Sequence, residues 1–245
     1  MIRPESWQPS SHAATISTSN EEVDRQMGGG IPVPMLMLIE GEHGAGKSAL
    51  VAQFMKGMLD SEKRVLYITT ESTIREYISK MKTITFNFSS YFLKNYLHIL
   101  SLQIDGITWS GTFSKHLLPV IRRYIHVNSK KFDVVVIDSL SMLTQHIESS
   151  TIMDFFSACK HFVSNGMTVI ITIHPNAVSE EAALRIRSTC DGYVRLASSS
   201  IAGRSVKVAE VVKLLGSSSQ VTSQFSFDVD QTFGIKILPL STANA

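Results

Sequence analysis

The amino-acid sequence predicts an α/β protein with a mainly parallel central sheet, flanked by helices and extended by C-terminal antiparallel hairpins. Short apolar runs alternate with longer amphipathic segments, and these runs lack the apolar–polar alternation of half-exposed strands. After Cys190 the segments become shorter and are separated by Gly and Ser. Strands that are apolar on both faces are typical of parallel sheets covered on both sides. Their alternation with helices indicates βαβ units.

The apolar runs predicted to be parallel strands are residues 35–39, 65–68, 97–102, 134–137 and 169–173. The amphipathic segments predict helices at residues 47–59, 73–81, 113–127 and 152–163. Short antiparallel strands are predicted at residues 193–196, 207–215, 224–229 and 234–237. Residues 1–19 are polar and aperiodic and predict a flexible arm, whereas residues 20–245 predict a single domain.

The composition indicates a globular chain of nearly neutral charge. Of the 245 residues, 44% are hydrophobic and 18% are charged, and 23 basic against 21 acidic residues give a net charge of +2. Binding to nucleic acid needs a concentrated basic surface that neutralises phosphates, so this charge balance does not indicate a general affinity for nucleic acid. A local basic patch is still compatible with it. Cys159 and Cys190 have no metal-ligand spacing, which argues against a disulfide scaffold or a zinc module.

The sequence contains no segment that predicts insertion into a membrane. No apolar run approaches the roughly 20 residues that a membrane-spanning helix needs. The first 20 residues are rich in Ser and Thr and lack the apolar core of a signal peptide. We therefore expect a cytoplasmic protein whose association with a membrane would come through a partner.

Residues 41–48 carry the complete GxxxxGK[ST] signature of a phosphate-binding loop, between a predicted strand and a predicted helix. Its glycines allow successive backbone N–H groups to point at a phosphate, and the helix N-terminus adds its positive dipole end. Lys47 is expected to reach the β and γ phosphates and the Ser48 hydroxyl to ligate Mg²⁺. A glycine-rich turn that only precedes a helix is the alternative. The predicted nucleotide-binding residues are Gly41, Glu42, His43, Gly44, Ala45, Gly46, Lys47 and Ser48.

Asp138 ends the apolar run at residues 134–137. Ligands bind at the carboxyl ends of parallel strands, and an Asp at this position can hold Mg²⁺ through water, as a Walker-B Asp does. The alternative is an Asp that only caps the following turn. Because Ser139, Leu140 and Ser141 follow, no acidic neighbour is available as a catalytic base next to Asp138.

Together these motifs resemble those of the RecA/KaiC-like ATPases and, among these, of the FlaH (or ArlH) family of archaellum accessory proteins. The segments that carry the resemblance are NEEVDRQMGGG at 20–30, residues 31–48, YITTE at 67–71, IDS at 137–139 and DGYVRL at 191–196. The resemblance covers roughly residues 19–238. It implies a RecA-type core sheet, ATP and Mg²⁺ as ligands, and a capacity to form hexameric rings.

The resemblance also implies a place in the cell and a set of partners. The family acts in the cytoplasm at the membrane base of the archaellum, the archaeal flagellum. There it contacts the motor ATPase, FlaI, and a ring-forming membrane protein, FlaX. No nucleic-acid partner is expected.

The first departure from the family pattern concerns the water-orienting glutamates. In KaiC-like ATPases the strand that carries Glu71 ends in two consecutive glutamates, which polarise the attacking water. Here Ser72 stands in the second position. A single carboxylate can still orient water, so Glu71 stays a candidate catalytic base. The alternative is an acid near the helix N-terminus before Thr73, favourable with the helix dipole.

The second departure concerns the cross-subunit cations. KaiC-like rings place a Lys-x-Arg pair that reaches the γ phosphate of the neighbouring subunit, and this chain has Lys213 but Leu215. A finger arginine is typically worth about 10³ to 10⁵ in rate, so its loss indicates slow turnover or none. Lys213 could instead be a solvated strand lysine. His174 stands where relatives place a γ-phosphate sensor, or is only a turn residue before Pro175.

Two further pairs of charged residues have both a functional and a structural interpretation. Asp24 and Arg25 precede the Gly triplet and either frame the nucleotide edge or form a surface ion pair. Arg185 and Arg187 stand where recombinases carry DNA-binding loops. No aromatic residue accompanies these two arginines, so a solvated or interface face is favoured over a stacking platform.

Two functions from different classes are therefore compatible with the sequence. The first is a nucleotide-dependent assembly module that hydrolyses ATP weakly or not at all. The second is an active ATPase of the DNA recombinase kind. The near-neutral charge and the missing arginine favour the first. A metabolic phosphotransferase would need a substrate domain with its own acid and base groups, for which the chain has no room.

Overall fold

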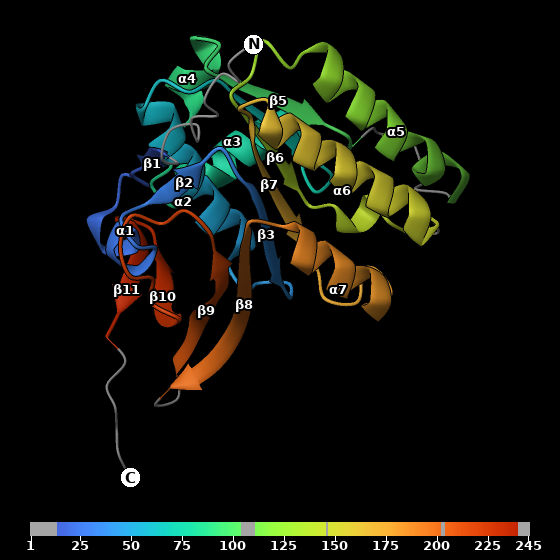
Figure 1. Ribbon diagram of the computed structural model, residues 1–245. Coiled ribbons are helices and arrows are strands. Elements are labelled where there is room, and N and C mark those ends of the chain that lie inside the picture. Colours follow the sequence, from blue (N-terminus) through green and yellow to red (C-terminus); the bar gives the residue numbers. More distant parts are fainter. Residues whose placement is uncertain (1–13, 104–110, 146, 202–203, 240–245) are drawn as a thin grey trace, which may run out of the picture.

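A computed structural model describes residues 14–103, 111–145, 147–201 and 204–239 and contains the predicted α/β sheet (Figure 1). Within these residues nine strands form one sheet in the order β11-β10-β9-β8-β3-β7-β6-β4-β5. The predicted α/β fold with a mainly parallel sheet is thus confirmed. The strands are β3 (Leu36–Gly41), β4 (Val65–Thr69), β5 (Leu97–Ser101), β6 (Val134–Asp138), β7 (Thr168–Ile173), β8 (Gly192–Ile201), β9 (Arg204–Leu214), β10 (Gln224–Asp230) and β11 (Gly234–Leu238).

The sheet has a parallel part and an antiparallel extension. Each neighbouring pair from β8 through β3, β7, β6 and β4 to β5 is parallel. Strands β9, β10 and β11 continue from β8 in antiparallel pairing. The prediction that the segment at 193–196 is antiparallel throughout is therefore wrong. Helix α7 carries the chain back across the sheet after β7, so β8 enters parallel to β3.

Helices cover both faces of the sheet (Figure 1). Their bounds are α2 (Lys47–Asp60), α3 (Ile74–Lys82), α4 (Ser89–Leu93), α5 (Gly111–Val127), α6 (Ser149–Ser164) and α7 (Glu180–Thr189). Alternate residues of β3 explain this layering. Met37 and Ile39 belong to the apolar cluster that contains α2 and α3, whereas Leu36 and Leu38 belong to the cluster that contains α5, α6 and α7. This pattern is why the run is apolar on both faces.

The predicted helices are all present, and their ends differ from the predicted ones by at most three residues. The sequence patterns did not predict α4 and α7. The first is a single short turn, and the second buries only Ala182 and Ile186, so neither shows a clear apolar period. In the part of the chain that the structure describes, no helix combines the length and apolar character that crossing a bilayer requires.

Residues 14–19, which were expected to belong to a flexible arm, are part of the folded structure. Strand β1 (Ala14–Ile16) pairs antiparallel with β2 (Ile31–Val33). The buried Thr18 carbonyl accepts a 2.7 Å hydrogen bond from the Gln53 amide in α2. Polar residues here are ordered because their backbone groups find partners in the rest of the fold. The remaining part of the predicted arm, residues 1–13, lies outside the described residues.

Asp24 holds this N-terminal segment in place. It lies in α1 (Glu21–Gln26), and its Oδ1 accepts hydrogen bonds from the Thr18 backbone N–H at 2.7 Å and from Thr18 Oγ1 at 2.6 Å. Its Oδ2 accepts a hydrogen bond from Ser17. These contacts argue against an ion pair between Asp24 and Arg25, because Thr18 and Ser17 occupy the Asp24 carboxylate. The interpretation that the two residues frame the nucleotide edge stays a prediction.

Gly57 in α2 tests this placement of the N-terminal segment. A Cβ at this position would lie 1.9 Å from the Ser17 carbonyl oxygen and 2.6 Å from Thr18 Cα. In an open helix Gly→Ala stabilises by about 1 kcal/mol. We expect Gly57→Ala instead to lower the free energy of unfolding by about 1–3 kcal/mol, as overpacking does. Chemical denaturation followed by circular dichroism measures the difference.

A chain that lacks residues 1–19 provides the control for this prediction. With Ser17 and Thr18 removed, the same Gly57→Ala change should be neutral or stabilising. If Gly57→Ala stabilises the full-length chain as well, residues 17 and 18 do not lie against α2.

Candidate functional site

Four predicted site segments meet at the edge where the parallel strands end. The phosphate loop follows β3, His174 follows β7, Asp138 ends β6, and Glu71 follows β4. These strands are neighbours in the order β3-β7-β6-β4. The chain thus brings together residues up to about 130 positions apart, at the edge where parallel sheets bind their ligands.

The phosphate loop presents an uncapped helix N-terminus. Gly44 and Gly46 have φ of 76° and 96°, so the loop needs glycine at both positions. Gly46 is the N-cap of α2, no side chain caps it, and the first turn of α2 has no acidic residue. The first N–H groups of α2 therefore have no side-chain acceptor and are oriented for an anion.

The C-terminal strands support this loop, which the sequence did not indicate. A Cβ on Gly46 would lie 2.9 Å from Lys207 Cδ and 3.0 Å from the Phe227 ring. Lys207 lies on β9 and Phe227 on β10, and Phe227 is fully buried. The antiparallel extension therefore packs against the loop, and a glycine at 46 is required for space as well as for its backbone angle.

Lys47 is buried inside the loop. Its Nζ donates hydrogen bonds to the carbonyl oxygens of Gly41 at 2.6 Å and Glu42 at 2.9 Å. Burial lowers the pKa of Lys47, and the charges of Asp138 and Glu71 oppose this change. The ammonium is thus held beneath the loop, where the phosphates of a nucleotide would be its strongest partners.

Asp138 is 3% exposed and has partners on both neighbouring strands. Its Oδ2 accepts a 2.7 Å hydrogen bond from the Tyr67 hydroxyl, and its Oδ1 accepts one of 2.6 Å from Thr172 Oγ1. Burial and the Asp138 charge raise the pKa of Tyr67 well above its ordinary value, so the phenol remains a donor. These contacts argue against an Asp that only caps the following turn.

Asp138 and Ser48 provide the chemistry that Mg²⁺ requires. Each carboxylate oxygen of Asp138 accepts one side-chain hydrogen bond and retains capacity for a metal-bound water. Ser48 lies in the first turn of α2, next to Lys47. Mg²⁺ prefers oxygen ligands and keeps several waters, so a hydroxyl with a carboxylate reached through water fits it.

His174 lies between the phosphate loop and the segment that follows Asp138. Its ring lies against that of His43, tilted by 32° with centroids 4.0 Å apart, and its Nδ1 is 3.0 Å from Ser141 Oγ. The Ser141 hydroxyl already accepts the His174 backbone N–H at 2.7 Å, so it can donate to Nδ1 and leave the ring proton on Nε2. The sequence did not indicate Ser141 or the contact with His43.

The environment of His174 favours the neutral ring. Burial lowers the pKa of His174 to about 4, with further contributions from Lys47 and His43, against the opposing charge of Asp138. At neutral pH the ring can therefore donate one hydrogen bond without adding charge. His174 also begins a turn, since its carbonyl accepts a hydrogen bond from the Ala177 N–H, and its role as a γ-phosphate sensor stays a prediction.

Glu71 is exposed at the edge of the site. Its charge acts on Lys47, and its backbone N–H donates to Thr69 Oγ1 at 3.2 Å. Helix α3 begins at Ile74, and the capping box formed by Thr73 and Glu76 satisfies its N-terminus. Glu71 precedes this cap and is not needed to satisfy the N-terminus of α3. Its carboxylate is therefore available to the site.

Lys213 is bonded within its own chain. Its Nζ donates to the carbonyl oxygens of Ser188 at 3.1 Å and Cys190 at 2.6 Å, at the end of α7. It is therefore not the solvated strand lysine of the alternative interpretation. Lys213 pairs with Tyr193, three positions before Leu196, which pairs with Gly41 of the loop. A cross-subunit role, which stays a prediction, would require Lys213 to release these carbonyls.

Arg187 forms a partly buried ion pair beside the loop. Its Nε and Nη2 donate to the Glu40 carboxylate at 3.0 and 2.8 Å, and the Tyr193 hydroxyl donates to Glu40 Oε2 at 2.7 Å. Burial alone would raise the pKa of Glu40, but Arg187 and Tyr193 hold it below the ordinary value. Arg187 is thus committed to Glu40 and unavailable to DNA, whereas Arg185 is exposed.

Comparison with known proteins supports the predicted resemblance. A family model described as "ATPase: KaiC" matches residues 16–242. The archaeal flagellar ATP-binding protein FlaH of Sulfolobus acidocaldarius is 40% identical over 230 residues, or 94% of this chain and 99% of that protein. The crystal structure of flagellar accessory protein FlaH from Methanocaldococcus jannaschii matches with a TM-score of 0.82 and 23% identity over 93% of this chain and 99% of that one. The DNA repair protein RadA of Rickettsia typhi is 28% identical over 166 residues, which is 65% of this chain but 33% of RadA.

Replacing Arg187 tests its structural role. We expect Arg187→Ala to lower the free energy of unfolding by about 2–4 kcal/mol, because the Glu40 carboxylate stays buried without its cation. Glu40 stabilises the fold above its ordinary pKa of 4.5, and this contribution is lost as the pH falls through its lowered pKa. The loss of stability caused by Arg187→Ala should therefore be largest near pH 7 and should shrink as the pH falls and Glu40 becomes protonated. Urea unfolding at pH 7 and an acid titration measure both effects.

Arg185→Ala is the matched control, since Arg185 is an exposed arginine on the same helix. Its effect should stay within about 0.5 kcal/mol. Arg187→Lys keeps the positive charge but loses the bidentate hydrogen bond to Glu40. Its loss in the free energy of unfolding should lie between those of Arg185→Ala and Arg187→Ala. Equal losses for Arg185→Ala and Arg187→Ala would show that the Glu40 pair does not stabilise this edge.

Proposed function

This chain belongs to the KaiC-like ATPases and, within them, to the FlaH family of archaeal flagellar ATP-binding proteins, and we propose that it is an ATP-binding regulatory component of an archaellum motor. Its nucleotide state would control ring assembly and contact with the motor ATPase. The single observation that carries this proposal is the complete binding edge beside an incomplete hydrolytic set. Nucleotide binding and hydrolysis require different groups of the chain.

Binding rests on groups that are all present. The uncapped N-terminus of α2 offers backbone N–H donors, and Lys47 supplies a cation beneath the loop. Ser48 and Asp138 supply the oxygens for Mg²⁺, and the neutral His174 ring is a candidate donor to the γ phosphate. Together they fit Mg-ATP, whose charges and metal need these groups.

Hydrolysis needs groups that this chain lacks or has altered. The attacking water must be oriented, and charge that develops in the transition state must be neutralised. Ser72 stands in place of a second glutamate, and Leu215, 55% exposed, stands in place of the cross-subunit arginine. Glu71 alone, with Lys213 held by its own chain, supports weak hydrolysis or none.

The family relationship supports a place at the membrane base of the archaellum, on its cytoplasmic side. We infer a hexameric ring as the working assembly, with the motor ATPase FlaI and the membrane ring protein FlaX as partners. Binding of ATP can bias such an assembly only if ATP binds one assembly state more tightly than another. The retained site, not hydrolysis, would supply this difference.

An active RecA-like ATPase acting on DNA is the alternative. The RadA similarity favours it, but it covers only a third of RadA. Arg187, which would have contacted DNA, is bonded to Glu40 instead. The alternative is therefore less well supported than the archaellum role.

Nucleotide-dependent assembly tests the proposed function. We expect the particle mass measured by light scattering, or the affinity for FlaI, to differ between Mg-ATP, Mg-ADP and nucleotide-free samples. Lys47→Ala removes the charge that faces the β and γ phosphates, so its behaviour in Mg-ATP should match that of the nucleotide-free parent. Identical mass and FlaI affinity of the parent in all three states would remove the regulatory role.

A further inference from the structure

Helices α5 and α6 lie side by side on one face of the sheet (Figure 1). A groove is lined by residues of both helices. Its volume is about 660 Å³, and it is lined by Pro119, Arg122, Arg123, His126, Val127, Ala158, His161 and Phe162. A second hollow of about 460 Å³ shares His126, His161 and Phe162 with it. The two hollows are therefore neighbours, and we call them together the α5–α6 groove.

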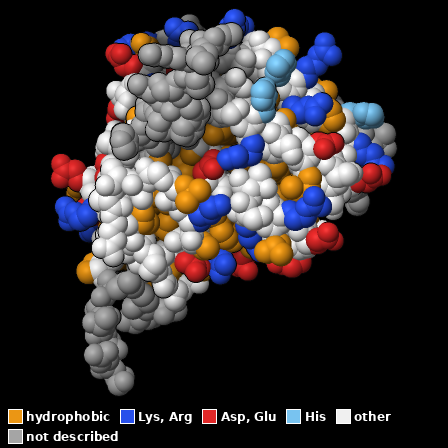
Figure 2. All heavy atoms as spheres, viewed as in Figure 1, with side chains coloured by type: hydrophobic (Ala, Val, Ile, Leu, Met, Phe, Trp, Pro, Cys, Tyr) orange, Lys and Arg blue, Asp and Glu red, His pale blue; other side chains and the backbone are white. Residues whose placement is uncertain are grey.

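The α5–α6 groove has an apolar floor and a basic rim. Phe162, only 5% exposed, and Ala158 lie at the floor, and Val127 is 69% exposed beside it. Arg122 and Arg123 are exposed on α5, and Lys130 and Lys131 follow that helix. Figure 2 shows Lys, Arg and His side chains interspersed with hydrophobic ones on the side of the molecule where α5 and α6 lie.

The basic side chains of the rim form no ion pair among the described residues. The ion pairs found there do not include Arg122, Arg123 or Lys130, although Asp154 of α6 lines a smaller hollow together with Arg122. Asp133, a carboxylate that lines the second hollow, accepts a hydrogen bond from a backbone N–H instead. In a chain with a net charge of only +2, this concentration of cations creates a local positive field.

The groove is separate from the nucleotide site. Asp133 and Gly166, which line the second hollow, precede β6 and β7, whereas Asp138 ends β6 and His174 follows β7. Residues at the start and end of these strands are separated by the strand length, roughly 17–20 Å. The groove therefore reaches the edge of the sheet opposite the phosphate loop, and ATP binding does not explain its charges.

We propose that the α5–α6 groove is a docking site for an acidic amphipathic segment of a partner protein. The apolar residues of that segment enter the groove above Phe162, and its carboxylates pair with Arg122 and Arg123. A bilayer is a less suitable occupant, because the apolar floor is recessed rather than protruding. Single-stranded nucleic acid is also disfavoured, because Phe162 is too buried to offer a stacking platform.

A synthetic peptide tests the proposed chemistry without requiring the natural partner. The probe is a labelled helical peptide with leucines at i, i+3, i+4 and i+7 and glutamates at the flanking positions. A second peptide carries lysine in place of every glutamate. Fluorescence anisotropy should report saturable binding of the acidic peptide, which weakens as salt is added, and no binding of the lysine peptide.

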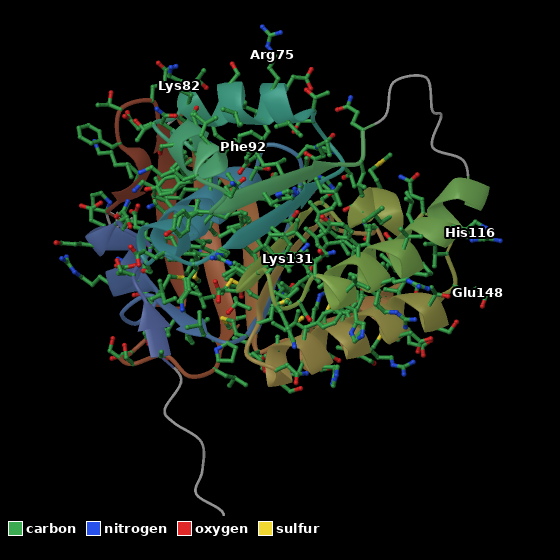
Figure 3. The ribbon with its side chains drawn as sticks, turned by 90° about the horizontal axis from the view of Figure 1, so that it is seen from above. Arg75, Lys82, Phe92, His116, Lys131 and Glu148 are labelled. Atoms are coloured by element: carbon green, nitrogen blue, oxygen red, sulfur yellow. The ribbon has the colours of Figure 1, made fainter. Side chains whose placement is uncertain are left out.

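Charge-reversal variants test whether the peptide binds at the α5–α6 groove. Arg122→Glu combined with Arg123→Glu should weaken binding of the acidic peptide by at least about tenfold. The matched control is Arg75→Glu combined with Lys82→Glu, which changes the net charge equally on the exposed surface of α3. Figure 3 shows these two side chains pointing away from the body of the protein, far from α5. The control should change binding by less than about twofold.

The milder pair Arg122→Gln with Arg123→Gln controls for a folding defect and should also weaken binding of the acidic peptide. The glutamate pair and the glutamine pair at these two positions should both keep the parent's unfolding temperature. Equal weakening by the rim and control pairs, or equal binding of the lysine peptide, would overturn the proposal. So would loss of binding to phosphatidylglycerol vesicles or to a single-stranded oligonucleotide in the rim variants while the acidic peptide is unaffected. Those results would make the groove a membrane or nucleic-acid surface.

Discussion

The ion pair between the buried Glu40 and the partly exposed Arg187 connects the phosphate loop to the rest of the fold. Glu40 ends the apolar part of the central strand, directly before the loop, and a carboxylate there must be paired because burial disfavours its charge. Arg187 of α7 and Tyr193 of β8 both donate hydrogen bonds to the Glu40 carboxylate, so these two elements pack at this position. The same β8 leads into the antiparallel strands whose Lys207 and Phe227 support Gly46. The loop geometry therefore depends on elements far along the chain.

The sequence predicts the parts of this structure that short contiguous patterns encode. The phosphate loop, the doubly apolar strands and Asp138 at a strand end are such patterns, and the structure places them together. The Glu40–Arg187 pair joins residues 147 positions apart, and no local pattern links them. Residues 14–19 are polar, and their order depends on Thr18 contacting Asp24 and Gln53. Ser141 near His174 is likewise a tertiary contact, and an unremarkable serine gives no signal.

The two ends of strands β6 and β7 have different chemistry. At their carboxyl ends, Asp138 and His174 lie beside Lys47 in a polar, largely buried site. At their amino ends, Asp133 and Gly166 line a basic groove with an apolar floor. A protein built for turnover would concentrate its charged groups around the phosphates. Here the basic residues Arg122, Arg123 and Lys130 lie away from the phosphate loop.

The central claim is that nucleotide binding is retained while hydrolysis is weak, and both can be measured on one preparation. Equilibrium titration with Mg-ATP should saturate at one nucleotide per chain. Phosphate release from the same sample should be slower by roughly three orders of magnitude than the 1 to 100 s⁻¹ typical of kinases. Turnover of several ATP per second, absent in Lys47→Ala, would contradict the claim. It would mean that Glu71, with Lys213 from a neighbouring subunit, is a sufficient catalytic set.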